Sequence, residues 1–429
     1  MRTATAPDQT GRGRLTAVQG AALYLGAVLG TGVVALPGLT ARAAGPASLV
    51  AWAGLVISSV PLAATFAALA SRYPDAGGVA TYVRRAFGAD AAAVTGWWFY
   101  LLLPVGMPAA ALIAGYYVAD AFGGGRTTAL VAGAALVLLV AVTNAGGVRV
   151  SGRAQLVVAG TLVLVLTAAV VIAVPYASAD NLTPFAPHGW PAVASAAVLL
   201  VWAFAGWEAV THLAGEFREP GRDIRRATTI AVVVTGVLYL AVAAVVLGVL
   251  GAAAGESNAS LSALLAATVG GPAPEAAAII AAVLTFGTTN AYLASGAKLG
   301  AALGRDGALP RALAAGSAVG EVPRRSLVLL LACSTLCFAA VAVTGVGLEP
   351  LVMMSSACLA TVYAAGTCAA IRLLPTGSWG RRAAIVATGL VVVLMVAAQW
   401  YLLFPLAVAL GAIAYRRLSR VRNRREYSN

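Results

Sequence analysis

The chain has 429 residues, of which 61% are hydrophobic and only 10% are charged. At that composition a water-soluble globular fold would have too little polar surface to cover itself, so the sequence predicts a polytopic membrane protein. The net charge of +13 would suit a nucleic-acid-binding protein, but the arginines fall in short clusters between apolar runs of bilayer-spanning length. That pattern argues against nucleic acid as a partner and for a lipid bilayer.

At about 20 residues per span, the apolar runs predict an all-α membrane protein with twelve transmembrane helices. The last two spans lie in one uncharged stretch that by itself would also fit a single long helix. The spans are expected at residues 16–43, 46–70, 90–120, 127–145, 154–176, 192–215, 227–250, 273–297, 326–345, 350–371, 383–398 and 401–415.

The basic residues set the topology. With a cytoplasmic N-terminus, all 28 Lys and Arg residues except Arg42 and Arg126 lie on the cytoplasmic side. So strong a positive-inside bias predicts that both termini are cytoplasmic. It therefore requires an even number of spans, with two short final helices that turn near Gln399.

Two of the predicted spans carry matching interruptions. The first contains Gly30-Thr31-Gly32, and the sixth contains Ala205-Gly206 just before Glu208. Glycine costs about 1 kcal/mol in a helix interior, and unwound backbone at membrane depth is tolerated only where it lines a cavity. Five spans separate the two breaks, which predicts a binding site within an inverted five-plus-five repeat. A close-packing patch of small residues is the alternative for the first break.

The broken helices predict the chemistry of the ligand. The half-helix that begins near Gly32 directs N–H groups and a positive dipole end at the cavity, which favours a carboxylate. The half-helix that ends near Phe204 directs carbonyls at it, which suits an ammonium group. Because few other charges are buried, we expect a neutral amino acid with an apolar side chain. Expected lining residues, each with ordinary core packing as the alternative, are Met107, Trp202, Phe204, Trp207, Met353 and Met354.

Glu208 and His212 are the only ionisable pair well inside the spans. The dipole of the second half-helix favours the Glu208 anion and burial favours the neutral acid, so its protonation would respond to pH or substrate. The equal alternative is a strut that bonds the exposed backbone of the break. For His212 a structural role is favoured over a proton relay, and no third ligand is apparent for a metal.

Three further assignments complete the interpretation. Thr288 and Thr289 would complete a sodium site, although membrane hydroxyls more often bond their own helix, so a proton is preferred as the coupling ion.

An intramembrane enzyme would need a nucleophile motif or metal set, and neither is present, so no enzyme activity and no cofactor are expected. The expected segments are a cytoplasmic tail (1–15), two five-helix repeats (16–176 and 192–371), helices 11 and 12 (383–415) and a basic cytoplasmic tail (416–429).

Several motifs in chain order resemble the amino acid-polyamine-organocation (APC) superfamily of permeases. They are Gly30-Thr31-Gly32 with Ala35-Leu36-Pro37, Tyr73-Pro74-Asp75-Ala76-Gly77-Gly78-Val79, Phe204-Ala205-Gly206-Trp207-Glu208, Glu216-Phe217-Arg218-Glu219-Pro220 with Arg225-Arg226-Ala227, and Lys298 before Arg305-Asp306-Gly307-Ala308-Leu309-Pro310. The resemblance implies a LeuT-like fold, alternating access and backbone recognition of the substrate's amino and carboxylate groups.

A narrower set of segments resembles the bacterial exporters of L-methionine and branched-chain amino acids. These are Val94-Thr95-Gly96-Trp97, the run 103–110 and Glu208-Ala209 with His212-Leu213-Ala214. This resemblance implies an exporter in the bacterial inner (plasma) membrane that carries methionine, leucine, isoleucine or valine. An importer, an exchanger or a transporter-like amino acid sensor are the alternatives. Span 5 lacks the lysine that replaces sodium in some proton-coupled relatives, and the turn 305–307 is typical of the wider superfamily.

Overall fold

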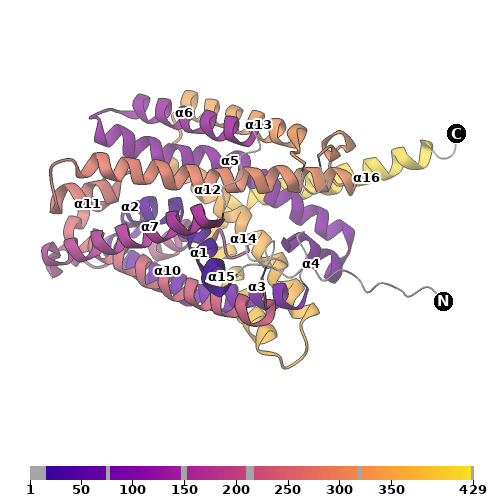
Figure 1. Ribbon diagram of the computed structural model, residues 1–429, viewed down its shortest axis with the longest axis horizontal. Coiled ribbons are helices and arrows are strands. Elements are labelled where there is room, and N and C mark those ends of the chain that lie inside the picture. Colours follow the sequence, from indigo (N-terminus) through magenta and orange to yellow (C-terminus); the bar gives the residue numbers. More distant parts are fainter. Residues whose placement is uncertain (1–15, 74–77, 146–151, 209–216, 317–320, 427–429) are drawn as a thin grey trace, which may run out of the picture.

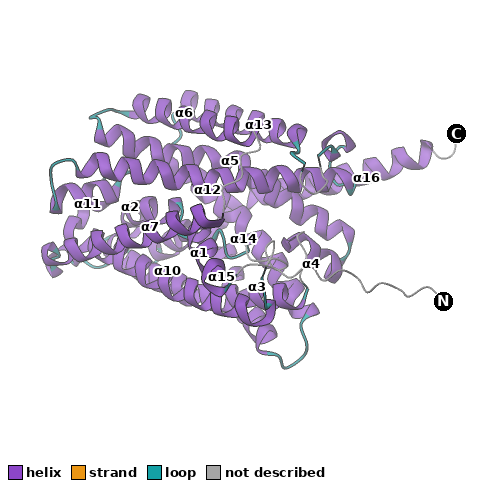
Figure 2. Cartoon of the chain, in the orientation of Figure 1, coloured by secondary structure: helices purple, strands orange, loops and turns teal. Residues whose placement is uncertain are grey.

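The structure is a computed structural model that describes residues 16–73, 78–145, 152–208, 217–316 and 321–426. Over these residues the chain forms helices and no strands (Figure 2). The α-helices are α1 (Ala17–Val28), α2 (Thr31–Ala44), α3 (Ser48–Arg72), α4 (Gly78–Phe87), α5 (Ala89–Ala121), α6 (Arg126–Ala145), α7 (Gly152–Ala173), α8 (Ala192–Leu200), α10 (Pro220–Leu250), α11 (Ser260–Thr268), α12 (Ala273–Arg305), α13 (Arg324–Thr344), α14 (Leu348–Leu373), α15 (Trp379–Ala398) and α16 (Leu403–Glu426).

Short 3₁₀ segments cap or join several of these helices. Most of them lie at a helix end, where the last turn tightens as its carbonyls run out of intrahelical partners. They are η1 (Gly45–Ala47), η2 (Val174–Tyr176), η3 (Ala179–Leu182), η4 (Val201–Phe204), η6 (Gly251–Gly255), η7 (Arg311–Ala314) and η8 (Gln399–Leu402).

Within the described residues, nine helical stretches are long and apolar enough to cross a membrane. Two of them, Thr31–Arg72 and Trp379–Ser419, each contain two α-helices, namely α2 with α3 and α15 with α16. Two shorter apolar helices, Ala17–Val28 and Ala192–Phe204, are the ones that end at the glycine-containing breaks. The chain is therefore an all-helical membrane protein, and the long helices run along one another in an elongated bundle (Figure 1).

Burial divides the long helices into a central and a peripheral set. The apolar windows of α5 and α14 are each 78% buried, whereas those of α6 and α13 are only 17% and 22% buried. In Figure 1, α6 and α13 accordingly lie along one edge of the bundle. Helix α2 is central, because most of its residues, from Thr31 to Ala41, are buried. Central helices without a lipid-facing side are the ones that can enclose a site.

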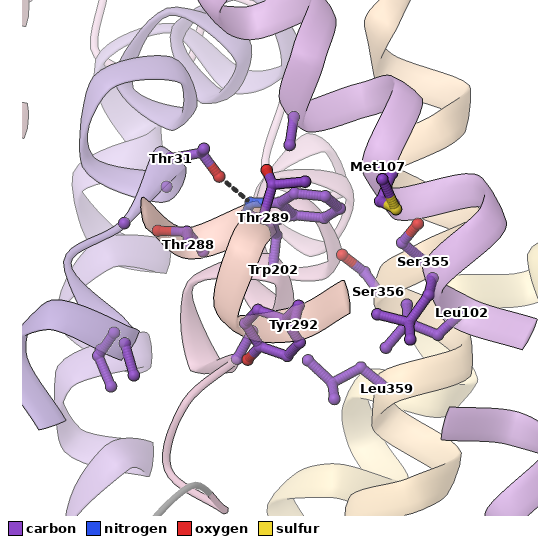
Figure 3. Close-up of a pocket in the computed structure, with 18 residues that line it drawn as sticks. Thr31, Leu102, Met107, Trp202, Thr288, Thr289, Tyr292, Ser355, Ser356 and Leu359 are labelled. Atoms are coloured by element: carbon purple, nitrogen blue, oxygen red, sulfur yellow. Dashed lines mark hydrogen bonds between the residues drawn. The ribbon is translucent and has the colours of Figure 1, made fainter. Parts of the chain in front are cut away.

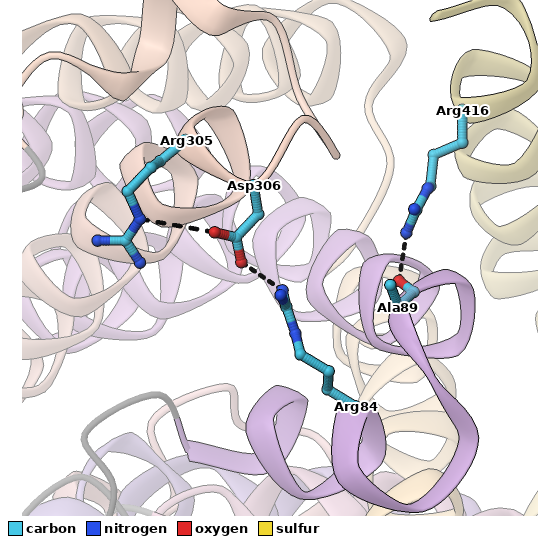
Figure 4. A network of polar contacts seen from close by, with 5 residues as sticks. All are labelled: Arg84, Ala89, Arg305, Asp306 and Arg416. Carbon is cyan, nitrogen blue, oxygen red and sulfur yellow. Dashed lines mark hydrogen bonds and ion pairs between the residues drawn. The ribbon is translucent and has the colours of Figure 1, made fainter. Parts of the chain in front are cut away.

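Charged side chains join several helices at one end of the bundle (Figure 4). Arg84 of α4 forms an ion pair with Asp306, which directly follows α12. Arg416 of α16 donates to the carbonyl of Ala89 at the start of α5 and lies 3.0 Å from the Asp90 carboxylate. These contacts link α4 to the end of α12 and α16 to the start of α5.

Candidate functional site

The first interrupted helix leaves the helical path at a glycine. Helix α1 ends at Val28, and α2 begins at Thr31 with Gly30 as its N-cap in a non-helical conformation (φ −41°, ψ −133°). A Cβ at position 30 would stand 2.6 Å from Oγ1 of Thr288 on α12. Position 30 therefore has little room for a side chain where α12 approaches.

The second interruption follows α8. The chain tightens into η4 and then turns through Ala205 and Gly206, whose φ of +117° is a conformation that side chains other than glycine rarely adopt. A Cβ on Gly206 would lie 2.9 Å from the backbone carbon of Ala27 in α1. The two breaks therefore pack directly on each other.

Tyrosine hydroxyls bond carbonyls at both breaks. Tyr239 donates to the carbonyl of Val28, the last residue of α1, at 2.6 Å. Tyr363 donates to the carbonyl of Phe204 at the end of η4, at 2.7 Å. The N-terminus of α2, by contrast, receives no side-chain cap at Gly30. The carbonyl ends of α1 and η4 thus have tyrosine partners, whereas the N-terminus of α2 has no capping side chain. Helix N-termini favour anions.

A cavity of about 70 Å³ lies where the breaks meet α5, α12 and α14 (Figure 3). The indole nitrogen of Trp202 donates to the Thr31 hydroxyl at 3.0 Å, which joins the two interrupted helices at its wall. Predicted site residues that line the cavity are Gly30, Thr31, Gly32, Met107, Trp202, Ala205, Thr288 and Thr289.

Other predicted site residues lie outside the cavity wall. The Phe204 and Trp207 side chains are only 2% and 1% exposed. Phe204 packs against the ring of Tyr363 at 6.5 Å between centroids, and Trp207 packs against that of Tyr24 at 5.7 Å. Both side chains therefore pack in the core, which was the alternative to lining the cavity. His212 lies outside the described residues.

Several lining residues carry no signal in the sequence. A lone serine or leucine in an apolar helix has no spacing that separates a cavity position from a packed one, and the adjacent pair Ser355-Ser356 resembles the pair Ser58-Ser59 of α3. The remaining lining residues are Ala27, Val28, Leu102, Leu103, Gly106, Ala110, Tyr292, Ser355, Ser356 and Leu359. Met353 and Met354 precede this pair on α14 but do not line the cavity.

Glu208 is 2% exposed and lies one side chain away from the cavity. Its carboxylate accepts from the backbone N–H of Gly206 at 3.1 Å and from the Tyr292 hydroxyl at 3.3 Å. It also lies 2.5 Å from the Tyr363 hydroxyl, whose single proton is shared between this carboxylate and the Phe204 carbonyl. The bond from the Gly206 N–H is the contact expected if Glu208 supports the exposed backbone of the break as a strut. Tyr292 itself lines the cavity, so its hydroxyl connects the cavity wall with the carboxylate.

Thr288 and Thr289 on α12, the expected sodium ligands, have both free and occupied oxygen atoms near them. The Thr289 hydroxyl is buried and makes no hydrogen bond among the described residues, whereas the nearby Val28 carbonyl already accepts from Tyr239. No group of three His, Cys, Asp or Glu residues in the described part of the chain is placed to hold a metal ion. The residues at this site therefore offer hydroxyl and backbone groups and no cluster of charged ligands.

A family model and several relatives of known sequence all identify the same protein family. The amino acid permease family model matches residues 15–424. The chain is 31% identical to the uncharacterized amino acid permease YecA of Bacillus subtilis, over 94% of this chain and 95% of the relative. It is 32% identical to the L-methionine/branched-chain amino acid exporter YjeH of Escherichia coli, over 92% of this chain and 93% of the relative. The branched-chain amino acid permease BcaP of Bacillus subtilis is 29% identical over 58% of this chain and 57% of the relative.

These relatives are permeases and exporters rather than enzymes. The match to the family model runs through both helix breaks and every helix that surrounds the cavity. The chain belongs to the amino acid permease family of the APC superfamily.

Proposed function

We propose that the chain is a secondary active transporter that exports neutral, apolar amino acids, namely methionine, leucine, isoleucine and valine, by alternating access. One observation carries this proposal. The cavity lies between two helix breaks, and none of its described lining residues is Asp, Glu, Lys, Arg or His. A charged substrate side chain would enter such a cavity without a counter-charge, at a large desolvation cost.

In this proposal the zwitterionic end of the substrate is held by backbone. The uncapped N-terminus of α2 supplies N–H groups and a positive dipole end for the carboxylate. Because the Phe204 carbonyl already accepts from Tyr363, the ammonium group would bind beside Ala205, the residue of that break which lines the cavity. Apolar residues of the lining, such as Leu102 and Leu359, would contact the side chain.

The proposed architecture has twelve spans arranged as an inverted five-plus-five repeat plus two helices. It is supported by the pairing of α1 with α2 as one broken span and by the break after η4 five spans later. The uneven distribution of Arg and Lys supports cytoplasmic termini and an inner-membrane location with the basic tail inside. Arg42 and Arg126 then face outward.

Glu208 is proposed to carry the coupled proton. It is a buried carboxylate next to one break and one side chain from the substrate, and such intramembrane acids serve as proton carriers in transporters. A neutral Glu208 donates to one of its tyrosine partners, whereas an ionised Glu208 only accepts, so the bonding of Tyr292 at the cavity wall depends on the proton. Sodium at Thr288 and Thr289 is the less favoured ion.

Flux in proteoliposomes tests this proposal and its alternatives. Labelled methionine and leucine should move when a pH gradient is imposed and should not require sodium. Export, import and exchange are separated by loading one side only, reversing the gradient and adding unlabelled substrate to the opposite side. Movement of no amino acid under any gradient would contradict the proposal, and binding without movement would indicate the sensor alternative.

A further inference from the structure

The cavity is not uniformly apolar. At the side formed by α12 and α14, the hydroxyls of Thr289, Ser355 and Ser356 are buried and make no hydrogen bond among the described residues. The three residues are 4%, 1% and 1% exposed. Figure 3 places Ser355 beside Met107 and Ser356 toward the ring of Trp202.

Among the described residues, buried hydroxyls without a hydrogen bond also occur at Ser48, Thr235 and Thr285, but of all six only those of Thr289, Ser355 and Ser356 belong to residues that line the cavity. Thr40, Ser59, Thr65 and Thr95 each donate to the carbonyl four residues earlier. That local bond is available to any helical serine or threonine at no cost in packing. Thr289, Ser355 and Ser356 do not use it, so their donors remain available to a ligand in the cavity, and a buried hydroxyl without a partner is unfavourable.

Gly106 leaves open space beside these hydroxyls, and Met107 borders that space. At Gly106 a Cβ would point at Trp202 and at Ser355, 3.6 and 3.7 Å away, so the glycine leaves this part of the cavity open. The Ser334 hydroxyl on α13 donates to the sulfur of Met107 at 3.5 Å, which holds that side chain against the cavity wall. The open space is thus bordered by apolar groups and by hydroxyls with unused hydrogen-bonding capacity.

We propose that Ser355 and Ser356, with Thr289, form a specificity subsite for a neutral side chain that carries a hydrogen-bond acceptor: a thioether, hydroxyl or carboxamide. The inference rests on the transport function proposed above and changes the order of its substrates, because side chains with an acceptor then rank above aliphatic side chains of equal size. Among apolar side chains it selects methionine, whose sulfur accepts weakly, over aliphatic chains of equal size. A site that supplies donors discriminates against an analogue that leaves them unpaired.

Two isosteric pairs measure this discrimination. Norleucine replaces the sulfur of methionine by a methylene, and valine replaces the hydroxyl of threonine by a methyl. We expect kcat/KM for flux to favour methionine over norleucine about three-fold and threonine over valine about ten-fold, the range of one weak and one ordinary neutral hydrogen bond. Competition against labelled methionine on the purified full-length protein gives the corresponding ratios of affinity without any need for flux.

The variants Ser355→Ala and Ser356→Ala should each reduce both ratios, and the double variant should bring them close to unity. Ser356→Cys, which is slightly larger and keeps a weak donor, should give intermediate ratios. Ser59→Ala is the matched control, because Ser59 is buried but bonds its own helix at Leu55, and it should leave the ratios unchanged.

The outcomes separate this inference from the proposed function. Equal handling of both members of each pair by the unchanged protein would overturn the subsite while leaving transport intact. Retained ratios in the double variant would show that other groups discriminate and would also overturn it. Failure of every amino acid to bind or move would instead contradict the transport function.

Discussion

The hydroxyl of Tyr292 donates to Oε1 of Glu208 at 3.3 Å while the same side chain lines the cavity. A buried carboxylate and the cavity are therefore separated by a single phenol. The ring of Phe99 stacks on Tyr292, with 6.4 Å between centroids, and fixes its position. Any change in the charge of Glu208 acts on a residue that the substrate would touch.

Glu208→Gln should abolish the dependence of transport on pH while retaining substrate binding. Glutamine is isosteric and keeps a carbonyl for the Gly206 N–H, but it cannot exchange a proton. Initial flux should be measured across a series of pH values and compared with Glu275→Gln, an exposed carboxyl at the start of α12. A pH profile that matches that of the unchanged protein would leave Glu208 only the strut role.

Tyr292→Phe should weaken the response to pH with little change in substrate affinity. The substitution removes the hydroxyl that reaches Glu208 but keeps the ring at the cavity wall and its stacking on Phe99. Affinity and pH profile are measured separately, by competition binding and by flux. A large loss of affinity with an unaltered pH profile would place the hydroxyl in substrate binding instead.

The bond between Trp202 and Thr31 should contribute to the free energy of unfolding as a coupled pair. Trp202→Phe and Thr31→Val each remove one partner of the 3.0 Å bond, and a double-mutant cycle should give a coupling of about 1 kcal/mol, that of a neutral hydrogen bond. Trp98→Phe is the control, since it loses a similar indole bond to the Pro405 carbonyl outside the cavity. Additive effects of the two substitutions would contradict the coupling.

Gly206→Ala should destabilise the protein. The residue adopts φ +117°, and a Cβ would meet the α1 backbone at 2.9 Å, so strain of about 1–3 kcal/mol is expected before any repacking. Gly389→Ala on α15 is the comparison, because nothing lies within 4 Å of its Cβ position, and alanine should be neutral or stabilising in that helix. Thermal melting in detergent should separate the two, and equal melting temperatures would argue against the strain.

The sequence predicts the breaks and their meeting point better than it predicts the cavity wall. Gly30 and Gly206 were identifiable because glycine is costly inside an apolar helix unless the backbone needs it. Whether an aromatic residue faces a cavity depends on rotation about the helix axis at an irregular 3₁₀ segment, which periodicity does not resolve. For that reason Trp202 lines the cavity, whereas Phe204 and Trp207 pack into the core.

Residues that serve the site from other helices were harder to find. Tyr292 and Tyr363 reach Glu208 from α12 and α14, and nothing in their local sequence distinguishes them from interface tyrosines of membrane proteins. The ion pair of Arg84 with Asp306 likewise joins segments more than 200 positions apart. Contacts of this kind depend on the packing of distant helices, which a single sequence does not specify.

The two tyrosine caps on the helix ends have a thermodynamic consequence. Because Tyr239 bonds the Val28 carbonyl and the Tyr363 hydroxyl lies 2.7 Å from the Phe204 carbonyl, an arriving ammonium group finds each of these oxygens with only one lone pair unused. Exchanging bonds to water for bonds to these partly used acceptors yields little net free energy. We therefore expect modest affinity and rapid release, which suit a protein whose task is turnover rather than retention.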